Sequence, residues 1–531
     1  MKVKSIISGV LAAALLLGSA SGAPLKKAKA ADEFDHQPVP SVKVEKNVDF
    51  KDCDADYQVT FSYENTTGKE VKSVTLNGTF QFYDANAKIV SEWSKIPGNV
   101  FFGAVGELPM TDAFGYKTGY QVEPWNMAGA DYKLKEVSKD HFEITLPLPG
   151  FVYEYMYTIE YADGTKDEMV EDPKNPSEKN PNRKGPFAAK SVVLVGNAKT
   201  AINDHGVCFP RADKKGTYSY VEYSCVDGTT QPLAVYLPYG YDESKVYPTI
   251  YASHGGGGDE TDWIGMGLLP NIMDNLIAEG KVPACVVVVM NHTYFNWDYD
   301  KIAKNFEKWL FPYMEKHYSV SKSYKDRALC GLSMGSMTTN TMMLEHTKLF
   351  DYYGCFSGGN GSSKVKDLEA LKAVSGIYIT AGELDMAYMG DSYHTDNDIT
   401  TIGFEERLDE LGINYTKDVK HGLHDWSCWR NALATFVRDT AFEGNVAKGT
   451  VKSVTAGKGS VKIKAAQVAV ADKYQFAYRV KGTKTWKYAS SKNATKTIKG
   501  LESGKTYEVA VRAVSGNNKG KFSAKKTVKV K

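Results

Sequence analysis

Hydrophobic and polar positions alternate with a period of two in the first part of the chain. The clearest case is 151–159, where every second residue from Phe151 to Ile159 is Phe, Tyr or Ile. A period of two predicts strands that bury one face. Several such segments, separated by Gly, Asn and Asp, predict an antiparallel immunoglobulin-like β-sandwich over 31–188.

A different pattern fills 189–446. Short apolar segments at 248–254, 284–290, 328–330 and 375–380 alternate with stretches of helical period such as 271–280 and 306–317. Apolar strands that alternate with helices predict a mostly parallel, doubly wound sheet covered on both faces. Alternation returns at 474–480 and 506–514 and predicts a second all-β sandwich over 447–531. The expected fold is therefore multidomain, with a central α/β domain between two sandwiches.

The first thirty residues have the pattern of a secretory signal. Lys2 and Lys4 precede an apolar run at 6–17, and the Ala-Lys-Ala sequence at 28–30 offers a cleavage site. The apolar run is short for a bilayer span, and no later segment approaches the length needed. We therefore expect a signal peptide at 1–30 and a secreted, extracellular protein without a membrane span.

Charge divides the chain unevenly. The whole sequence has a formal net charge of +2, but 447–531 contains 21 Lys and Arg against 3 Asp and Glu, which is +18. The remainder has 65 − 21 = 44 basic and 63 − 3 = 60 acidic residues, or −16. The basic residues at 447–531 are interleaved with Val, Ile, Tyr and Thr, which is typical of a folded domain with a solvated basic face. We expect its partner to be an anionic cell-surface polymer and not a nucleic acid.

Seven cysteines are few for 531 residues, and none forms a CxxC pair. This spacing suggests neither a zinc site nor a disulfide scaffold. We expect at most one or two disulfides, whose pairing the sequence does not give, and no metal or other cofactor. The oligomeric state is also left open.

One pentapeptide predicts a nucleophile. Gly331-Leu332-Ser333-Met334-Gly335 follows an apolar strand and precedes a helical stretch. The small residues permit a sharp strand-to-helix turn that lifts a serine hydroxyl above the sheet, as in α/β-hydrolases. Ser333 is therefore the predicted nucleophile.

A serine nucleophile needs a base and an acid, and the sequence offers two candidates for each. His421 and His424 share the loop after the strand-like segment 415–419, and the Gly-x-His-Asp-Trp context favours His424. Glu383 and Asp385 both follow the strand at 376–380. The order Ser, acid, His fits the fold, but spacing alone does not separate the two carboxylates. His346, within a helical stretch, and His394, in a polar loop, are less suited.

A glycine loop predicts the oxyanion hole. Four glycines at 255–258 come directly after the strand that ends at Ser253, so the backbone there can approach a substrate closely. The N–H of Met334 would supply a second donor. Neither GK[ST] nor GxGxxG follows, so a nucleotide site is not favoured.

Three segments together resemble carbohydrate esterase family 1, which includes bacterial feruloyl and acetylxylan esterases. They are 254–263 (HGGGGDETDW), the pentapeptide around Ser333 and 422–429 (GLHDWSCW). The resemblance spans about 216–442 and implies an α/β-hydrolase. It favours Asp385 over Glu383 through the family's Gly-x-x-Asp segment, matches His424, and implies Gly256 and Met334 as oxyanion donors. Ser336-Met337 departs from relatives, which often carry a glycine there.

The flanking regions have resemblances too. Residues 31–188 resemble a family 48 carbohydrate-binding module, in which Trp93 and Trp125 could stack on sugars. Residues 447–531 resemble a fibronectin type III domain, especially at 501–507. Aromatic residues in or beside the central motifs are predicted to bind substrate: Trp263, Tyr294, Trp297 and Trp429.

The resemblance implies release of feruloyl groups from plant xylan by a Ser-His-Asp acyl-enzyme mechanism. Alternatives are an acetylxylan esterase, a siderophore esterase of the same superfamily, an acyltransferase, and an inactive carbohydrate-binding or adhesion protein. The acyl preference and the ligands of the flanking domains are not given by the sequence.

Overall fold

The computed structural model describes residues 39–83, 110–117, 120–122, 132–177, 190–202, 205–383, 385–389, 400–442, 446, 448–515 and 518–531. The predicted signal peptide at 1–30, together with Trp93, Trp125 and His394, lies outside the described residues. Within the described ranges, we find no helix with the length and apolarity needed to cross a bilayer.

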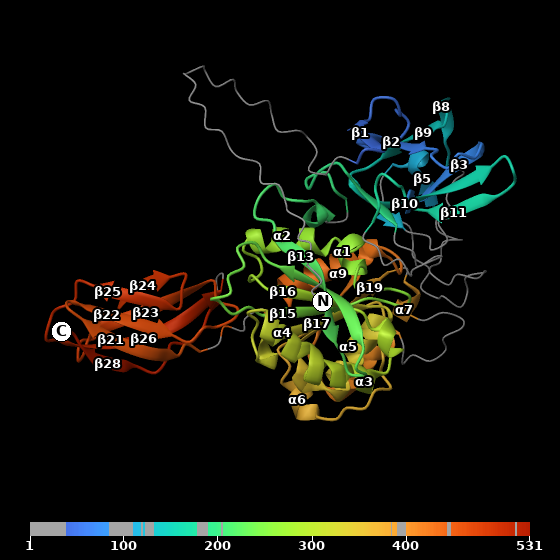
Figure 1. The fold of residues 1–531 in the computed structure, drawn as a ribbon. Helices are drawn as coiled ribbons and strands as arrows, with labels where there is room; N and C mark the ends of the chain where they lie inside the picture. The colour runs from blue at the N-terminus through green and yellow to red at the C-terminus, as the bar shows by residue number, and fades with distance from the viewer. Residues whose placement is uncertain are drawn as a thin grey trace, which may run out of the picture. The chain divides into compact units, whose positions relative to one another are not determined.

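An eight-stranded sheet forms the central domain (Figure 1). Its order is β13-β14-β16-β15-β17-β18-β19-β20, and the six strands from β16 to β20 run parallel. The antiparallel β13 and β14 complete one edge. The strands are β13 (Thr217–Ser224), β14 (Thr230–Leu237), β15 (Thr249–Ser253), β16 (Val286–Met290), β17 (Arg327–Leu332), β18 (Tyr352–Phe356), β19 (Gly376–Gly382) and β20 (Thr416–Lys420).

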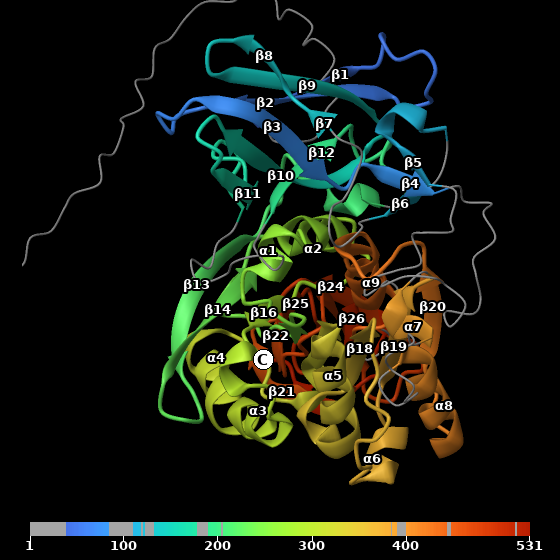
Figure 2. The same ribbon diagram turned by 90° about the vertical axis from the view of Figure 1, so that its right-hand side faces the viewer.

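Two separate apolar clusters pack against this sheet, and each contains residues from a different set of helices. Because the strands contribute to both clusters, they are apolar without alternation. Figure 2 labels the helices concerned. The first cluster includes α1 (Asp262–Gly265), α2 (Leu269–Ala278) and α9 (Trp426–Asp439). The second includes α3 (Tyr299–Asn305), the π-helical turn η6 (Phe306–Leu310), α4 (Phe311–His317), α5 (Met334–Glu345), α6 (Leu368–Lys372) and α8 (Thr401–Leu411). Shorter elements are α7 (Met386–Met389) and the 3₁₀ turns η4 (His205–Cys208), η5 (Thr293–Phe295), η7 (Tyr324–Asp326) and η8 (Thr347–Leu349).

Parallel pairing fixes where the chemically interesting loops lie. The strands β15, β17, β19 and β20 end at Ser253, Leu332, Gly382 and Lys420, all at the same edge of the sheet. The glycine loop, Ser333, the two carboxylates and the two histidines follow directly. In open parallel sheets this carboxyl edge is where ligands bind.

The N-terminal β-domain packs its strands around one apolar core. Its β10 is buried at nine of eleven positions, whereas strict alternation predicts one buried face. The second face is buried because Val152 joins an apolar cluster of the central domain. Strand β12 pairs with β10, so the domain extends to Val195, past the predicted boundary at 188.

The sheets of the N-terminal β-domain are β1-β2-β9-β8, β11-β10-β3-β7 with β12, and β5-β4-β6. The bounds are β1 (Val42–Lys46), β2 (Tyr57–Glu64), β3 (Val71–Gly78), β4 (Gln81–Tyr83), β5 (Met110–Asp112), η2 (Ala113–Gly115), β6 (Tyr120–Val122), β7 (Tyr132–Lys133), β8 (Lys135–Ser138), β9 (His141–Leu148), β10 (Phe151–Tyr161), β11 (Lys166–Val170) and β12 (Ser191–Val195).

The C-terminal β-domain also has one apolar core, shared by two sheets. The sheets are β21-β22-β25 and β24-β23-β26-β27, with β28 paired to β26. The bounds are β21 (Val451–Gly457), β22 (Ser460–Ala465), β23 (Lys473–Val480), β24 (Lys487–Ser491), β25 (Thr495–Lys499), β26 (Thr506–Ser515), β27 (Asn518–Lys519) and β28 (Lys526–Lys529).

A buried ion pair joins α9 to β10. Arg430 Nη2 lies 2.6 Å from Glu154 Oε1, and both side chains are fully buried. Arg430 Nε also donates to the carbonyl of Met266, at 2.7 Å, and Lys190 Nζ lies 3.1 Å from the other oxygen of Glu154. Several partners therefore satisfy charges that burial would otherwise make very costly.

All seven cysteines are buried thiols and none is in a disulfide. Burial raises the pKa of Cys208 to about 12, and it raises the pKa of Cys285, Cys330 and Cys355 further. These cysteines act as small apolar core residues.

We predict that Arg430→Met lowers the free energy of unfolding by about 3–5 kcal/mol, because Glu154 is left buried with weaker charge compensation. The double variant Glu154→Gln/Arg430→Met should regain part of that loss. Calorimetric unfolding of both single variants and the double variant measures the coupling. Strict additivity of the three changes would contradict a direct interaction.

Candidate active site

The backbone of Ser333 adopts a conformation that non-glycine residues rarely take, with φ 52° and ψ −122°. It lies between the end of β17 and the first residue of α5. A Cβ on Gly331 would lie 2.3 Å from the carbonyl oxygen of Gly335, and one on Gly335 would lie 2.4 Å from that of His254. Glycine is therefore required on both sides, as the sequence pattern predicts.

Three side chains form a hydrogen-bonded chain at this turn. Ser333 Oγ lies 2.9 Å from His424 Nε2, and His424 Nδ1 lies 2.8 Å from Asp385 Oδ1. His424 and Asp385 are 5% and 0% exposed, so the contact between them is shielded from water, whereas Ser333 stays partly exposed to solvent. Burial would raise the pKa of Asp385, but His424, the nearby Ser357 hydroxyl and the Ala387 N–H outweigh it, and the pKa is lowered. Asp385 is therefore an anion, which can hold His424 in the tautomer with a proton on Nδ1.

The two competing residues form a separate pair. His421 Nδ1 lies 2.8 Å from Glu383 Oε1, on the exposed side of the same loops. The structure thus gives each histidine its own carboxylate, and only the His424–Asp385 pair contacts Ser333. His346 lies near Asp300, beyond the far end of α5.

The glycine loop lies against the nucleophile turn. A Cβ on Gly256 would lie 2.8 Å from Met334 Sδ, which brings the two predicted oxyanion donors into neighbouring positions. Met334 is the first residue of α5, so its N–H has no acceptor within the helix. These two backbone groups are suited to hold a negative oxygen beside Ser333.

Two buried histidines fix this loop. His254 Nδ1 lies 2.6 Å from the carbonyl oxygen of Gly255, so this nitrogen carries a proton. His254 Nε2 accepts the N–H of His292 at 3.0 Å. His292 Nδ1 lies 2.9 Å from Ser253 Oγ. Burial, with an electrostatic interaction with His254 as a smaller cause, lowers the pKa of His292 to about 3, so His292 is neutral at pH 7.

The four predicted substrate-binding aromatics occupy different environments. Tyr294 is 47% exposed, and Trp297 is half-buried. Both lie just after β16, at the carboxyl edge. Trp263 and Trp429 are instead 0% and 5% exposed, and the Trp263 indole donates to the carbonyl of Ser253 at 3.0 Å. These two rings belong to the core, so substrate contact is expected only from Tyr294 and Trp297.

Trp429 points to a residue that the sequence analysis missed. Its indole N–H donates to Ser357 Oγ at 2.9 Å, and its ring stands edge-on to His424 with centroids 5.0 Å apart. Ser357 has φ 59° and helps to lower the pKa of Asp385. Its only signal in the sequence is a Ser-Gly-Gly segment directly after an apolar strand.

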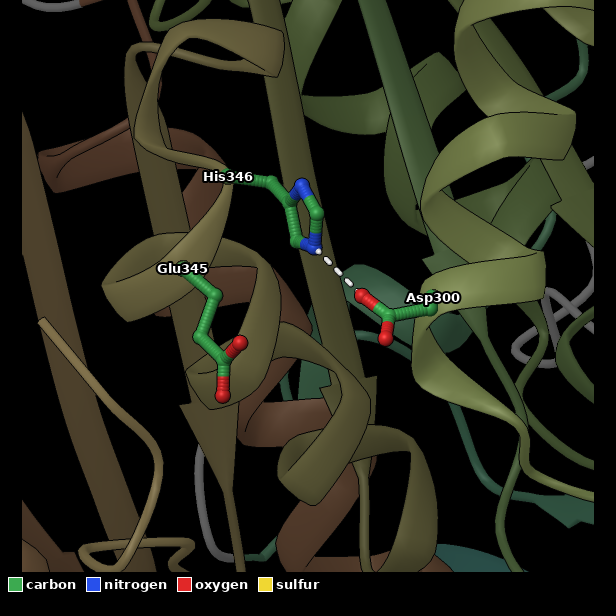
Figure 3. A group of neighbouring side chains, drawn as sticks. All are labelled: Asp300, Glu345 and His346. Atoms are coloured by element: carbon green, nitrogen blue, oxygen red, sulfur yellow. Dashed lines mark ion pairs between the residues drawn. The ribbon is translucent and has the colours of Figure 1, made fainter. Parts of the chain in front are cut away.

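One group of side chains has the composition of a metal site. Asp300, Glu345 and His346 lie together, and Figure 3 shows the His346 ring directed at the Asp300 carboxylate, 3.5 Å away. Lys366 Nζ is 3.0 Å from Glu345 Oε2 and 3.9 Å from Asp300 Oδ1. Lys366 thus already forms ion pairs with both carboxylates, and we assign an ion-pair network here. The 12 residues of α5 place it roughly 18 Å from Ser333.

Comparison with known proteins agrees with the geometry. The Esterase family model matches residues 228–440. An endo-1,4-beta-xylanase/feruloyl esterase of Xylanibacter ruminicola is 35% identical over 221 residues, which are 39% of this chain and 28% of that protein. Endo-1,4-beta-xylanase Y of Acetivibrio thermocellus is 31% identical over 147 residues, 26% of this chain and 14% of that protein. The chain therefore spans less than a third of the length of these relatives, and the region that the Esterase family model matches contains Ser333, Asp385 and His424.

Solved structures with some likeness include a ferulic acid esterase of Anaeromyces mucronatus in complex with ferulic acid. It has 23% identity and a TM-score of 0.35, over 44% of this chain and 93% of that one. The enterobactin esterase of Shigella flexneri has 13% identity and a TM-score of 0.45, over 75% of this chain and 95% of that one. Likeness at this level says nothing about the substrate.

We predict that Asp385→Asn lowers kcat for p-nitrophenyl acetate by about 10⁴-fold, because the amide no longer favours the reactive tautomer of His424. Glu383→Gln is the matched control and should keep kcat close to wild type. Steady-state kinetics of both variants tests the assignment, and a large loss in Glu383→Gln alone would reverse it.

Proposed function

We propose that this chain is a secreted feruloyl esterase, which hydrolyses esters between hydroxycinnamic acids and the sugars of plant xylan. The observation that supports it most is the Ser333–His424–Asp385 hydrogen-bonded chain at the carboxyl edge of the sheet. This site lies within residues 228–440, which the Esterase family model matches, and the chain is 35% identical over 221 residues to a xylanase/feruloyl esterase.

The first half of the reaction forms an acyl-enzyme. His424 Nε2 accepts the proton of Ser333 as Oγ attacks the ester carbonyl. The N–H groups of Gly256 and Met334 donate hydrogen bonds to the resulting oxyanion. When the intermediate collapses, the bond to the sugar oxygen breaks and His424 returns the proton to that oxygen.

Hydrolysis of the acyl-enzyme completes the cycle. His424 takes a proton from a water molecule, whose oxygen attacks the acyl carbon of the Ser333 ester. Collapse expels Ser333 Oγ, which regains the proton, and the hydroxycinnamate leaves. The anionic Asp385 stabilises the imidazolium of His424 in both halves, with no cofactor required.

The acyl group would contact the rim formed by Tyr294 and Trp297. Tyr294 presents an exposed ring, and the Trp297 ring lies 5.6 Å from that of His254, beside the glycine loop. A planar aromatic acyl group gains more from such rings than an acetyl group does. This favours feruloyl over acetyl substrates.

The flanking domains extend the proposal. We infer that the N-terminal β-domain is a carbohydrate-binding module of family 48 type and that the C-terminal one is of fibronectin type III. The C-terminal domain has two sheets around one core, and the N-terminal domain has two larger sheets and a third, three-stranded sheet around one core, which is consistent with β-sandwiches. Export through the segment at 1–30 would bring the enzyme to its polymeric substrate.

We predict that Ser333→Ala lowers kcat by about 10⁴–10⁶-fold on every ester that the enzyme cleaves, since the nucleophile is lost. Wild-type enzyme should release ferulate from methyl ferulate and feruloylated arabinoxylan faster than acetate from acetylated xylan or acid from a tri-catecholate ester. Chromatography of the released acids ranks the four.

The alternatives correspond to other outcomes of the same assay. Faster release of acetate from acetylated xylan would indicate an acetylxylan esterase instead of a feruloyl esterase. Faster cleavage of the catecholate ester would indicate a siderophore esterase. Transfer product in excess of free acid at high sugar concentration would indicate an acyltransferase. Activity on none of the four, or full activity in Ser333→Ala, would refute the esterase mechanism.

We predict that Tyr294→Ala reduces kcat/KM for methyl ferulate by about tenfold, about 1.4 kcal/mol, and hardly changes that for an acetyl ester. Tyr239→Ala is the matched control, because Tyr239 is 60% exposed and follows the antiparallel β14 at the opposite edge of the sheet. Equal losses on both esters would place Tyr294 outside the acyl site.

A further inference from the structure

The outer face of one sheet of the C-terminal β-domain carries aromatic and cationic side chains. Strand β23 pairs with β24 on one side and β26 on the other, so Ala477 lies between Tyr488 and Ala510, and Gln475 lies opposite Arg512. The aromatic-basic face, as we call it, consists of Trp486 and Tyr488, Arg479, Arg512 and Phe522 (sheet labelled in Figure 1).

The charged groups of this face are held against aromatic rings. The Arg479 guanidinium lies 4.3 Å from the centre of the Trp486 ring and is 2.7 Å, at Nε, from Glu508 Oε2. The Arg512 guanidinium lies 4.5 Å from the centre of the Phe522 ring, and its Nε donates to Gln475 Oε1 at 2.8 Å. Both guanidinium planes are therefore oriented before any ligand arrives.

The exposed part of the face combines a ring with an available cation. Tyr488 is 54% exposed, and its ring lies 6.1 Å from Phe522, which in turn contacts Arg512. Glu508 pairs with Arg479, whereas Arg512 has no carboxylate partner among the described residues. Ala477 and Ala510, which lie between these side chains in the sheet, are only 3% and 4% exposed, so the larger side chains around them form the surface of the face.

The opposite sheet of the domain supplies a contrast. Its outward positions include Lys462, Lys464 and Thr497, all exposed, without an aromatic residue among the outward positions of β22 and β25. Positive charge is therefore spread over the whole domain, which is +18 over 447–531. The combination of rings with arginine distinguishes the aromatic-basic face.

We propose that the aromatic-basic face binds an acidic polysaccharide, a chain of pyranose sugars that carry carboxylates. The apolar face of a sugar ring would lie on Tyr488 and Phe522. The planar fork of Arg512 would pair with a uronic acid carboxylate, since guanidinium and carboxylate match in geometry. A phosphate polymer without pyranose rings could pair with the arginines but would have no ring to lie on Tyr488. The exposed tyrosine therefore favours a uronic acid polymer. This binding is independent of the acyl group that Ser333 transfers.

The test uses the full chain and unesterified polymers, so that the esterase site contributes nothing. Affinity electrophoresis in polygalacturonate should retard the wild type, and neutral arabinoxylan should retard it less. In Tyr488→Ala/Arg512→Gln we expect about a tenfold loss of affinity for polygalacturonate. The matched control, Thr497→Ala/Lys462→Gln on the opposite sheet, removes the same charge and should stay within about twofold of wild type.

A second variant separates shape from charge. Arg512→Lys keeps the charge but loses the planar fork, so it should also bind polygalacturonate more weakly. Unchanged Tm and unchanged kcat/KM on p-nitrophenyl acetate verify that each variant is folded. Equal losses in the face variant and its control, or tighter binding of polyphosphate or DNA than of polygalacturonate, would overturn the proposal.

Discussion

The strained backbone of Ser333 is the constraint on which the site depends. Its φ of 52° and ψ of −122° belong to a conformation that costs on the order of 1–3 kcal/mol and persists only where neighbours enforce it. Gly331 and Gly335 permit the turn. At Gly335 the carbonyl oxygen of His254 lies so close to the backbone that no side chain would fit. The nucleophile turn and the glycine loop are therefore packed against one another without spare volume. Neither can move without the other, so the serine and its oxyanion donors stay in register.

Parallel pairing then brings distant segments of sequence to this turn. Asp385 and His424 are separated from Ser333 by 52 and 91 positions, yet each follows directly on a strand that ends at the same edge. Support for the acid comes from Ser357, after the neighbouring β18, and from Trp429 on α9. The geometry of the site is thus a property of the sheet, whereas the individual loops supply the chemistry.

Much of this architecture could be predicted from the sequence, because periodicity and the glycine-flanked serine report on backbone geometry. The central sheet, Ser333 and the two loops that carry the base and the acid follow from local patterns and chain order. The choice of Asp385 over Glu383 rests instead on the resemblance to carbohydrate esterase family 1, because spacing alone leaves both carboxylates open. The environments of Trp263 and Trp429 could not be predicted in the same way. The sequence of a loop motif does not indicate whether a tryptophan side chain in it is buried or exposed, because tertiary packing determines the burial of that ring. Likewise, the pairing of β12 with β10 is a long-range contact that leaves no mark on local alternation.

The buried thiols bear on the conditions in which the protein can mature and persist. With no disulfide to form, folding after export would require neither an oxidant nor an isomerase, and reductants should leave the fold intact. Desolvation raises the pKa of thiols such as Cys285 and Cys330 and so suppresses the thiolate that oxidants attack. A chain built this way is indifferent to the redox potential of its surroundings, and anoxic and aerated media should support it equally well.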